Sequence, residues 1–85
     1  SRVQEQYNRY IGLYIEIDKS MTRGVYDYIN EFGYELSSVE KKRDKTLKGS
    51  DIVLIMMLDL KKRRNHAEVL SEVSQIEGVH YLEEV

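Results

Sequence analysis

The stretch Ile52-Val53-Leu54-Ile55-Met56-Met57-Leu58, residues 52–58, decides the fold of this chain. Every position is apolar, β-branched residues are frequent, and a charged residue bounds the run on each side. The run is too short for a core helix, and a continuous apolar run of this kind is typical of a strand covered on both faces. We therefore expect residues 52–58 to form a central strand of a sheet.

Three elements precede this central strand. Residues 10–17 alternate between apolar and mixed side chains, which predicts a half-buried strand. A helix follows, with Ser20 and Thr22 as capping candidates and Gly33 as its end. Residues 34–42 are extended and charge-rich, and their apolar positions change phase, as in a bulged edge strand. The helix carries an apolar stripe made of Val25, Tyr28, Ile29 and Phe32.

Two elements follow the central strand. Asn65 is a candidate N-cap with Glu68 three positions on, a capping-box arrangement that begins a second helix. Gly78 ends that helix, and residues 79–85 predict one last strand. The inner stripe of the second helix consists of Val69, Leu70, Val73 and Ile76.

The order strand, helix, strand, strand, helix, strand predicts an α+β fold. Two right-handed strand-helix-strand crossovers in one sheet give a ferredoxin-like βαββαβ sandwich, a four-stranded antiparallel sheet with two helices on one face. The first and third strands are then central, and the last strand pairs beside the first. We expect residues 1–9 to be a lead-in from a preceding segment and residues 10–85 to be one domain.

Composition narrows the class of protein. The net charge is −2, and the chain has neither cysteine nor proline. Disulfides and thiolate metal sites are therefore excluded, and no general attraction to nucleic acid is implied. No apolar stretch approaches the roughly 20 residues of a membrane span, so we expect a soluble chain. The chain begins Ser1-Arg2-Val3 without an initiator methionine, and we interpret it as a piece of a longer protein.

No pattern in the sequence indicates catalysis, a cofactor or a metal site. The two histidines, His66 and His80, lack metal-ligand spacing, and both are predicted to be exposed. Asp18, Asp44 and Asp51 are expected at one end of the sheet, where acids commonly cap helices and turns. We therefore expect a protein that is not an enzyme.

The whole pattern from residue 10 onward resembles ACT-type regulatory domains. The segments that carry the resemblance are IEID (15–18), FGYELSSVE (32–40), DIVLIMMLDL (51–60) and IEGVHYLEEV (76–85). The terminal feature L-x-x-I-x-G-V-x-x-V of that family is matched by Val73, Ile76, Gly78, Val79 and Leu82. Asp18 and Gly24 resemble its acid-then-glycine loop after the first strand, which implies a small-molecule effector site at these two residues.

Within that family, the polar lead-in SRVQEQYNRYIGLYIEID (1–18) resembles the cytosolic C-terminal domain of MgtC/SapB-type membrane proteins. Those proteins are associated with magnesium homeostasis. The resemblance implies a non-catalytic regulatory or protein-interaction domain. It also implies a cytoplasmic location, tethered to the inner face of the cell membrane through the missing N-terminal region.

One face of the predicted sheet has no helix to cover it. Val53, Ile55 and Met57 of the central strand point to that face, together with Tyr14 of the first strand. Tyrosine and methionine are enriched at protein contacts. We expect these four residues to form an interface, and we expect a homo-oligomer because an apolar face needs cover.

A basic cluster follows the central strand. It consists of Lys61, Lys62, Arg63 and Arg64. Neighbouring central strands run antiparallel, so the cluster is expected beside Arg2 and Arg9, where the chain enters the first strand. If the lead-in joins a membrane span, this cluster is membrane-proximal.

Two alternatives share this fold. One is an amino-acid-sensing ACT domain of a metabolic enzyme, which only the sequence upstream in the parent gene distinguishes. The other is a nucleic-acid-binding module, because Tyr10, Tyr14 and Tyr34 interleave with basic residues. The third strand, however, offers Ile, Val, Leu and Met in place of base-stacking aromatics, so we do not expect a nucleic-acid partner.

Overall fold

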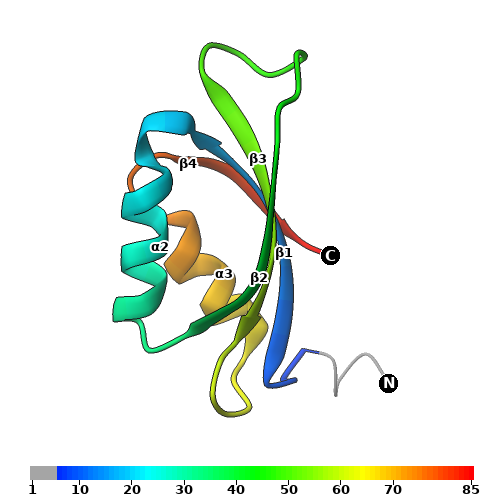
Figure 1. Ribbon diagram of the computed structural model, residues 1–85. Helices are drawn as coiled ribbons and strands as arrows, with labels where there is room; N and C mark the ends of the chain where they lie inside the picture. Colours follow the sequence, from blue (N-terminus) through cyan, green and yellow to red (C-terminus); the bar gives the residue numbers. More distant parts are fainter. Residues whose placement is uncertain (1–5) are drawn as a thin grey trace.

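The structure is a computed structural model that describes residues 6–85. Its elements in chain order are β1 (Tyr10–Asp18), the 3₁₀ turn η1 (Lys19–Met21), α2 (Thr22–Glu31), β2 (Glu35–Lys42), β3 (Asp51–Asp59), α3 (His66–Ser74) and β4 (Val79–Glu84). The strands form one antiparallel sheet in the order β2-β3-β1-β4, and α2 and α3 lie on the same side of it (Figure 1). The predicted α+β, ferredoxin-like fold is confirmed, with residues 52–58 in a central strand.

The core lies between the sheet and the two helices. β1 and β3 pair residue by residue, from Tyr10 opposite Asp59 to Asp18 opposite Asp51. Successive side chains of a strand point to opposite faces, so every second residue points toward the helices. The buried set is Ile11, Leu13, Ile15 and Ile17 of β1 with Ile52, Leu54, Met56 and Leu58 of β3. The predicted alternation of β1 is therefore confirmed.

The start of α2 differs from the sequence prediction. Asp18 Oδ1 accepts hydrogen bonds from the backbone N–H and the hydroxyl of Ser20, at 2.9 and 2.7 Å. Thr22 Oγ1 donates to the carbonyl of Lys19, and no side chain caps the first turn of α2. The prediction that Ser20 and Thr22 cap this helix is wrong, because Asp18 caps the preceding turn η1 instead.

The buried stripe of α2 also differs in one residue. Val25 and Ile29 are buried and Phe32 packs against the core, as predicted. Tyr28 is exposed, and Tyr26 packs against the core in its place. The helix turns the side that carries Val25, Tyr26 and Ile29 toward the sheet, so the prediction for Tyr28 is wrong.

The second helix follows the predicted pattern. Asn65 Oδ1 accepts the N–H of Ala67 at 2.8 Å, which confirms the N-cap. Val69, Val73 and Ile76 are buried, and Leu70 is half-buried. The prediction that Gly78 ends this helix is wrong, because α3 ends at Ser74 and Gly78 lies in the turn before β4. Gly78 takes φ +95°, and its carbonyl accepts the N–H of Asp18 at 2.9 Å. The glycine therefore joins the end of β1 to the start of β4.

The edge strand β2 has the predicted irregularity. Its register on β3 shifts between Leu36 and Ser38, as in a bulge. A second shift, which the sequence did not predict, lies between Glu16 and Ile17 where β1 meets β4.

The described part of the lead-in lies against the domain. The N–H of Leu60 donates to the carbonyl of Arg9, and the N–H of His66 donates to the carbonyl of Gln6, both at 2.8 Å. Residues 1–5, and with them the predicted position of Arg2, lie outside the described residues. Within residues 6–85, no helix is long and apolar enough to cross a membrane.

Candidate functional site

The side of the sheet that faces away from the helices is the main candidate surface, and we name it the open face. Three rows of residues cross it from β2 to β4, as the strand register requires. The first row is Lys42, Val53, Glu16 and Tyr81. The second is Glu40, Ile55, Tyr14 and Glu83, and the third is Ser38, Met57, Gly12 and Val85.

Large apolar side chains remain accessible on this open face. Tyr10, Met57, Tyr81 and Val85 are 49, 39, 47 and 69% exposed, and they are four of the seven large hydrophobic residues that the described chain exposes. Ile55 and Tyr14 are half-buried. Three of the four predicted interface residues thus lie accessible on one face, whereas Val53 is only 4% exposed and adds little surface.

Gly12 lies at the floor of a hollow on the open face. The hollow measures about 420 Å³, and its lining includes Gly12, Ile55, Met57 and Val85 together with Glu40. The N–H of Val85 donates to the carbonyl of Gly12 at 3.0 Å, and a Cβ at Gly12 would lie 3.3 Å from Val85 Cγ2. The absence of a side chain at Gly12 therefore lets Val85, which follows β4, lie close against β1.

Tyr14, Glu16, Tyr81 and Glu83 form a cluster beside this hollow, which we name the Tyr/Glu quartet. Tyr14 Oη donates to Glu16 at 2.9 Å, and Tyr81 Oη donates to Glu83 at 3.1 Å. The two rings meet edge to face with centroids 6.2 Å apart. The hydrogen bond to Glu16 raises the pKa of Tyr14, and that to Glu83 raises the pKa of Tyr81. Each hydroxyl therefore stays a donor, and both carboxylates are held on the open face.

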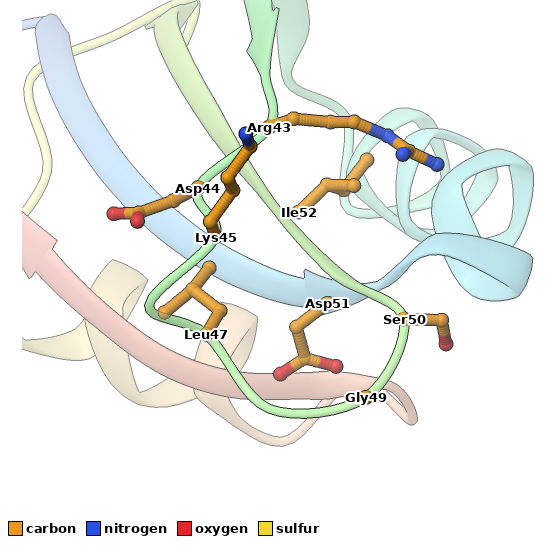
Figure 2. Close-up of a pocket in the computed structure, with 8 residues that line it drawn as sticks. All are labelled: Arg43, Asp44, Lys45, Leu47, Gly49, Ser50, Asp51 and Ile52. Atoms are coloured by element: carbon orange, nitrogen blue, oxygen red, sulfur yellow. The ribbon is translucent and has the colours of Figure 1, made fainter.

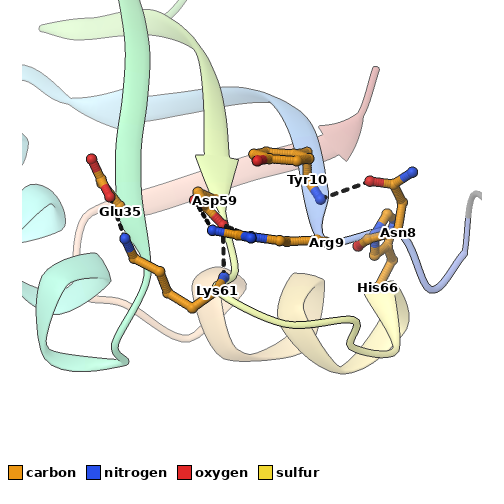
Figure 3. Close-up of polar contacts among 7 residues, drawn as sticks. All are labelled: Asn8, Arg9, Tyr10, Glu35, Asp59, Lys61 and His66. Carbon is orange, nitrogen blue, oxygen red and sulfur yellow. Dashed lines mark hydrogen bonds and ion pairs between the residues drawn. The ribbon is translucent and has the colours of Figure 1, made fainter.

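The predicted basic cluster lies at one end of the sheet, where β1 begins (Figure 3). Arg9 makes two hydrogen bonds to Asp59, at 2.7 and 2.8 Å, and the bond lowers the pKa of Asp59 to about 2. Asp59 also accepts the N–H of Lys61, which takes φ 72°, and the Lys61 ammonium pairs with Glu35. The predicted proximity of the cluster to Arg9 is confirmed.

The other three cluster residues differ in whether their charged groups contact the rest of the domain. The Arg64 guanidinium lies over the ring of Tyr34, 5.3 Å from its centroid, and 4.0 Å from a Glu72 oxygen. Lys62 and Arg63 are exposed, and neither forms an ion pair within residues 6–85. Lys62 and Arg63 are therefore the cluster charges most available to an external surface.

His66 departs from its predicted exposure. It is 3% exposed, its Nε2 lies 2.7 Å from the carbonyl of Asn8, and its Nδ1 lies 2.8 Å from a Glu84 oxygen. The prediction is wrong because the lead-in and the end of β4 converge over the first turn of α3. His66 therefore ties both chain ends of the domain together.

The predicted effector residues lie at the other end of β1. The Asp18 carboxylate is engaged by Ser20, and that side-chain hydrogen bond lowers the pKa of Asp18. Gly24 lies inside α2, where a Cβ would approach only Met21 Cε, at 3.7 Å. The structure gives Asp18 a capping role and Gly24 an ordinary helical position, and the effector site stays a prediction.

The loop between β2 and β3 encloses a separate pocket of about 240 Å³ (Figure 2). Asp44 accepts hydrogen bonds from the N–H and hydroxyl of Thr46, and Figure 2 shows that the side chains of Arg43 and Asp44 point in opposite directions. The carboxylate of Asp51 instead lies within hydrogen-bonding distance of His80 Nδ1. Within residues 6–85, no group of three or more His, Cys, Asp or Glu side chains is placed to hold a metal ion.

His80 provides a pH-dependent contact. Its Nδ1 lies 2.7 Å from Asp51, and this hydrogen bond raises the pKa of His80 above its usual value. The contact with Asp51 therefore contributes its full stabilisation of the folded state below the unfolded-state pKa of His80. This contribution is lost as the pH rises through the folded-state pKa of His80. Its predicted exposure is confirmed, with 52% of the side chain accessible.

We expect His80→Gln to lower the melting temperature most at acidic pH. Melting curves of the parent and the variant between about pH 5 and pH 8 check this, because histidine titrates in that range. The difference between the two proteins should shrink as the pH rises. A difference that stays constant over the range would contradict the assigned contact.

The sequence matches no known family model and no curated protein. The fold is shared with solved structures. The C-terminal domain of the MgtC protein from Mycobacterium tuberculosis superposes with a TM-score of 0.65 at 15% identity, over 95% of this chain and 88% of that one. The ACT domain from GTP pyrophosphokinase of Chlorobium tepidum superposes with a TM-score of 0.62 at 15% identity, over 89% of this chain and 96% of that one.

These likenesses establish the fold. The chain has an ACT-like fold, which resembles that of the MgtC C-terminal domain, as the sequence predicts. Sequence reasoning found Tyr14, Ile55 and Met57 of the open face but missed Glu16, Tyr81 and Glu83. Period-two alternation places each of these on a face, yet only the register between β1 and β4 brings them together.

Proposed function

We propose that this chain is a non-catalytic regulatory domain, the cytoplasmic C-terminal part of an MgtC/SapB-like membrane protein linked to magnesium homeostasis. The observation that carries the proposal is the shared fold with the MgtC C-terminal domain over 95% of the chain. The domain acts by contact with other surfaces, through the open face and through the basic end.

The basic end supports attachment beside a membrane. Arg9 and the segment that carries Lys62 and Arg63 lie where the chain enters β1, because the N–H of Leu60 donates to the carbonyl of Arg9 and Arg63 donates to the carbonyl of Tyr7. A preceding membrane span would join the domain at this point. Anionic lipids of the cytoplasmic leaflet attract each nearby Lys or Arg by about 1 kcal/mol. Because Lys62 and Arg63 are exposed, they face the leaflet in this arrangement.

We expect Lys62→Gln/Arg63→Gln to weaken binding of the domain to anionic vesicles by about 30-fold, since two charges contribute about 2 kcal/mol. Co-sedimentation with vesicles at low salt measures the change. Lys41→Gln/Lys48→Gln removes the same charge from the opposite end of the sheet and serves as the matched control. Equal binding by all three proteins, or binding by none, would remove the membrane assignment.

A second candidate is an amino-acid-sensing ACT domain of a metabolic enzyme, which the likeness to the ACT domain from GTP pyrophosphokinase favours. The sequence encoded upstream of this segment distinguishes the two. Several apolar spans of roughly 20 residues would support the membrane protein. A catalytic domain would support the enzyme and overturn the first proposal.

A further inference from the structure

The open face has an apolar centre and an acidic border. Met57, Ile55 and Val85 line the hollow at its centre. Glu16, Glu40 and Glu83 surround that centre, and Lys42 is the single basic residue of the three rows, paired with Glu40 at 3.4 Å. A partner that complements this surface therefore carries apolar side chains together with positive charge.

A second copy of the chain complements this surface poorly. The middle row runs Glu40, Ile55, Tyr14, Glu83, so a carboxylate stands at each end. Two sheets packed face to face stay nearly aligned and are related by a two-fold axis. An axis along the strands, centred on this row, places Glu40 against Glu83 of the second copy. A two-fold axis across the strands places Glu40 against Glu40 of the second copy and Glu83 against Glu83 of the second copy. Both arrangements therefore bring like charges together.

The Tyr/Glu quartet offers a place for a cation. Its two aromatic rings are 6.2 Å apart, and each is hydrogen bonded to one carboxylate. Lys and Arg side chains bind at aromatic faces within about 6 Å of a ring centroid, and a carboxylate strengthens the contact. The quartet is therefore suited to a Lys or Arg side chain that reaches the edge of the apolar centre.

We propose that the open face binds a basic amphipathic segment of a protein partner, with its apolar side chains in the hollow beside Gly12 and a Lys or Arg in the Tyr/Glu quartet. This inference rests on the proposed function in taking the open face as a contact surface. Segments of this kind border membrane spans on the cytoplasmic side, where Lys and Arg are in excess. The domain then contacts the membrane-embedded part of its own protein or of a neighbour.

A labelled amphipathic peptide of leucine and lysine is the probe, and its leucine and glutamate counterpart is the charge control. Fluorescence anisotropy should show binding of the lysine peptide alone. Glu16→Gln/Glu83→Gln keeps the shape of the quartet and should weaken that binding by about tenfold, because two partly exposed charge contacts are lost. Met57→Ser should also weaken binding of the lysine peptide, because it removes apolar surface from the hollow. The salt dependence of binding should change little, because no charge is removed.

Glu31→Gln/Glu77→Gln is the matched control, because it removes the same charge from exposed positions outside the open face. Equal weakening by both double variants, or by neither, would overturn the proposal. A parent protein that sediments as a dimer, and that the lysine peptide does not dissociate, would also overturn it in favour of a second copy. Lys62 and Arg63 are intact in these variants, so vesicle binding tests the membrane assignment separately.

Discussion

Gly78→Ala is expected to lower the free energy of unfolding by about 2–5 kcal/mol. Gly78 takes φ +95°, which costs a residue with a side chain about 1–2 kcal/mol. A Cβ at this position would also overlap Cβ and Cγ of Met21, at the start of α2. The overlap adds about 1–3 kcal/mol, as overpacking does in a well-packed core.

Substitutions at two other glycines separate the backbone cost from the cost of the overlap with Met21. Gly33 has φ +91°, but a Cβ added there would meet no atom within 4 Å, so Gly33→Ala should show the backbone cost alone, about 1–2 kcal/mol. Gly24 is helical, and a Cβ there would make only an ordinary contact with Met21 Cε at 3.7 Å, so Gly24→Ala should stabilise by about 0.5–1 kcal/mol. Urea unfolding of the three variants gives the comparison. Equal losses at Gly78 and Gly33 would show that Met21 moves aside at no cost.

His66→Ala is expected to destabilise the domain by about 2–4 kcal/mol, because two hydrogen bonds and a buried side chain are lost. The partners are the carbonyl of Asn8 and the carboxylate of Glu84, which belong to the lead-in and to β4. In a domain of this size, the change should lower the melting temperature by roughly 8–30 °C.

Hydrogen exchange separates this link from a general loss of packing. The N–H of His66 donates to the carbonyl of Gln6, so the variant should lose protection at residue 66 before the strands β1 and β3 do. His80→Ala, measured at about pH 8 where the contact of His80 with Asp51 contributes least, is the matched control, since it removes an exposed histidine. A melting temperature of His66→Ala within a few degrees of the control would show that the buried contacts contribute little.

The two proposed contact surfaces are separate on the molecule. Lys62 and Arg63 lie at the end of the sheet where the chain enters, whereas Glu16, Glu83 and Met57 lie across its open face. A membrane at the basic end therefore leaves the open face accessible. One domain is able to rest beside the leaflet and bind a basic segment at the same time.

The local sequence by itself determined the order of elements, the central place of β3, the bulge in β2 and the cap at Asn65. Each of these depends on the period of apolar residues, on a short-range hydrogen bond or on the handedness of crossovers, which neighbouring residues specify. The sequence also singled out Gly78 as a turn glycine before the last strand, but α3 ends earlier, at Ser74, and the overlap with Met21 depends on a contact between distant segments.

Only the tertiary structure decided the burial of His66, the exchange of Tyr28 for Tyr26 in the core and the assembly of the Tyr/Glu quartet. His66 has polar neighbours in the first turn of a helix, and it is buried because the lead-in and β4 converge on it. Glu16 and Tyr81 become neighbours through a strand register that includes a shift after Glu16. Register and chain convergence arise from long-range packing, which the periodicity of one segment does not encode.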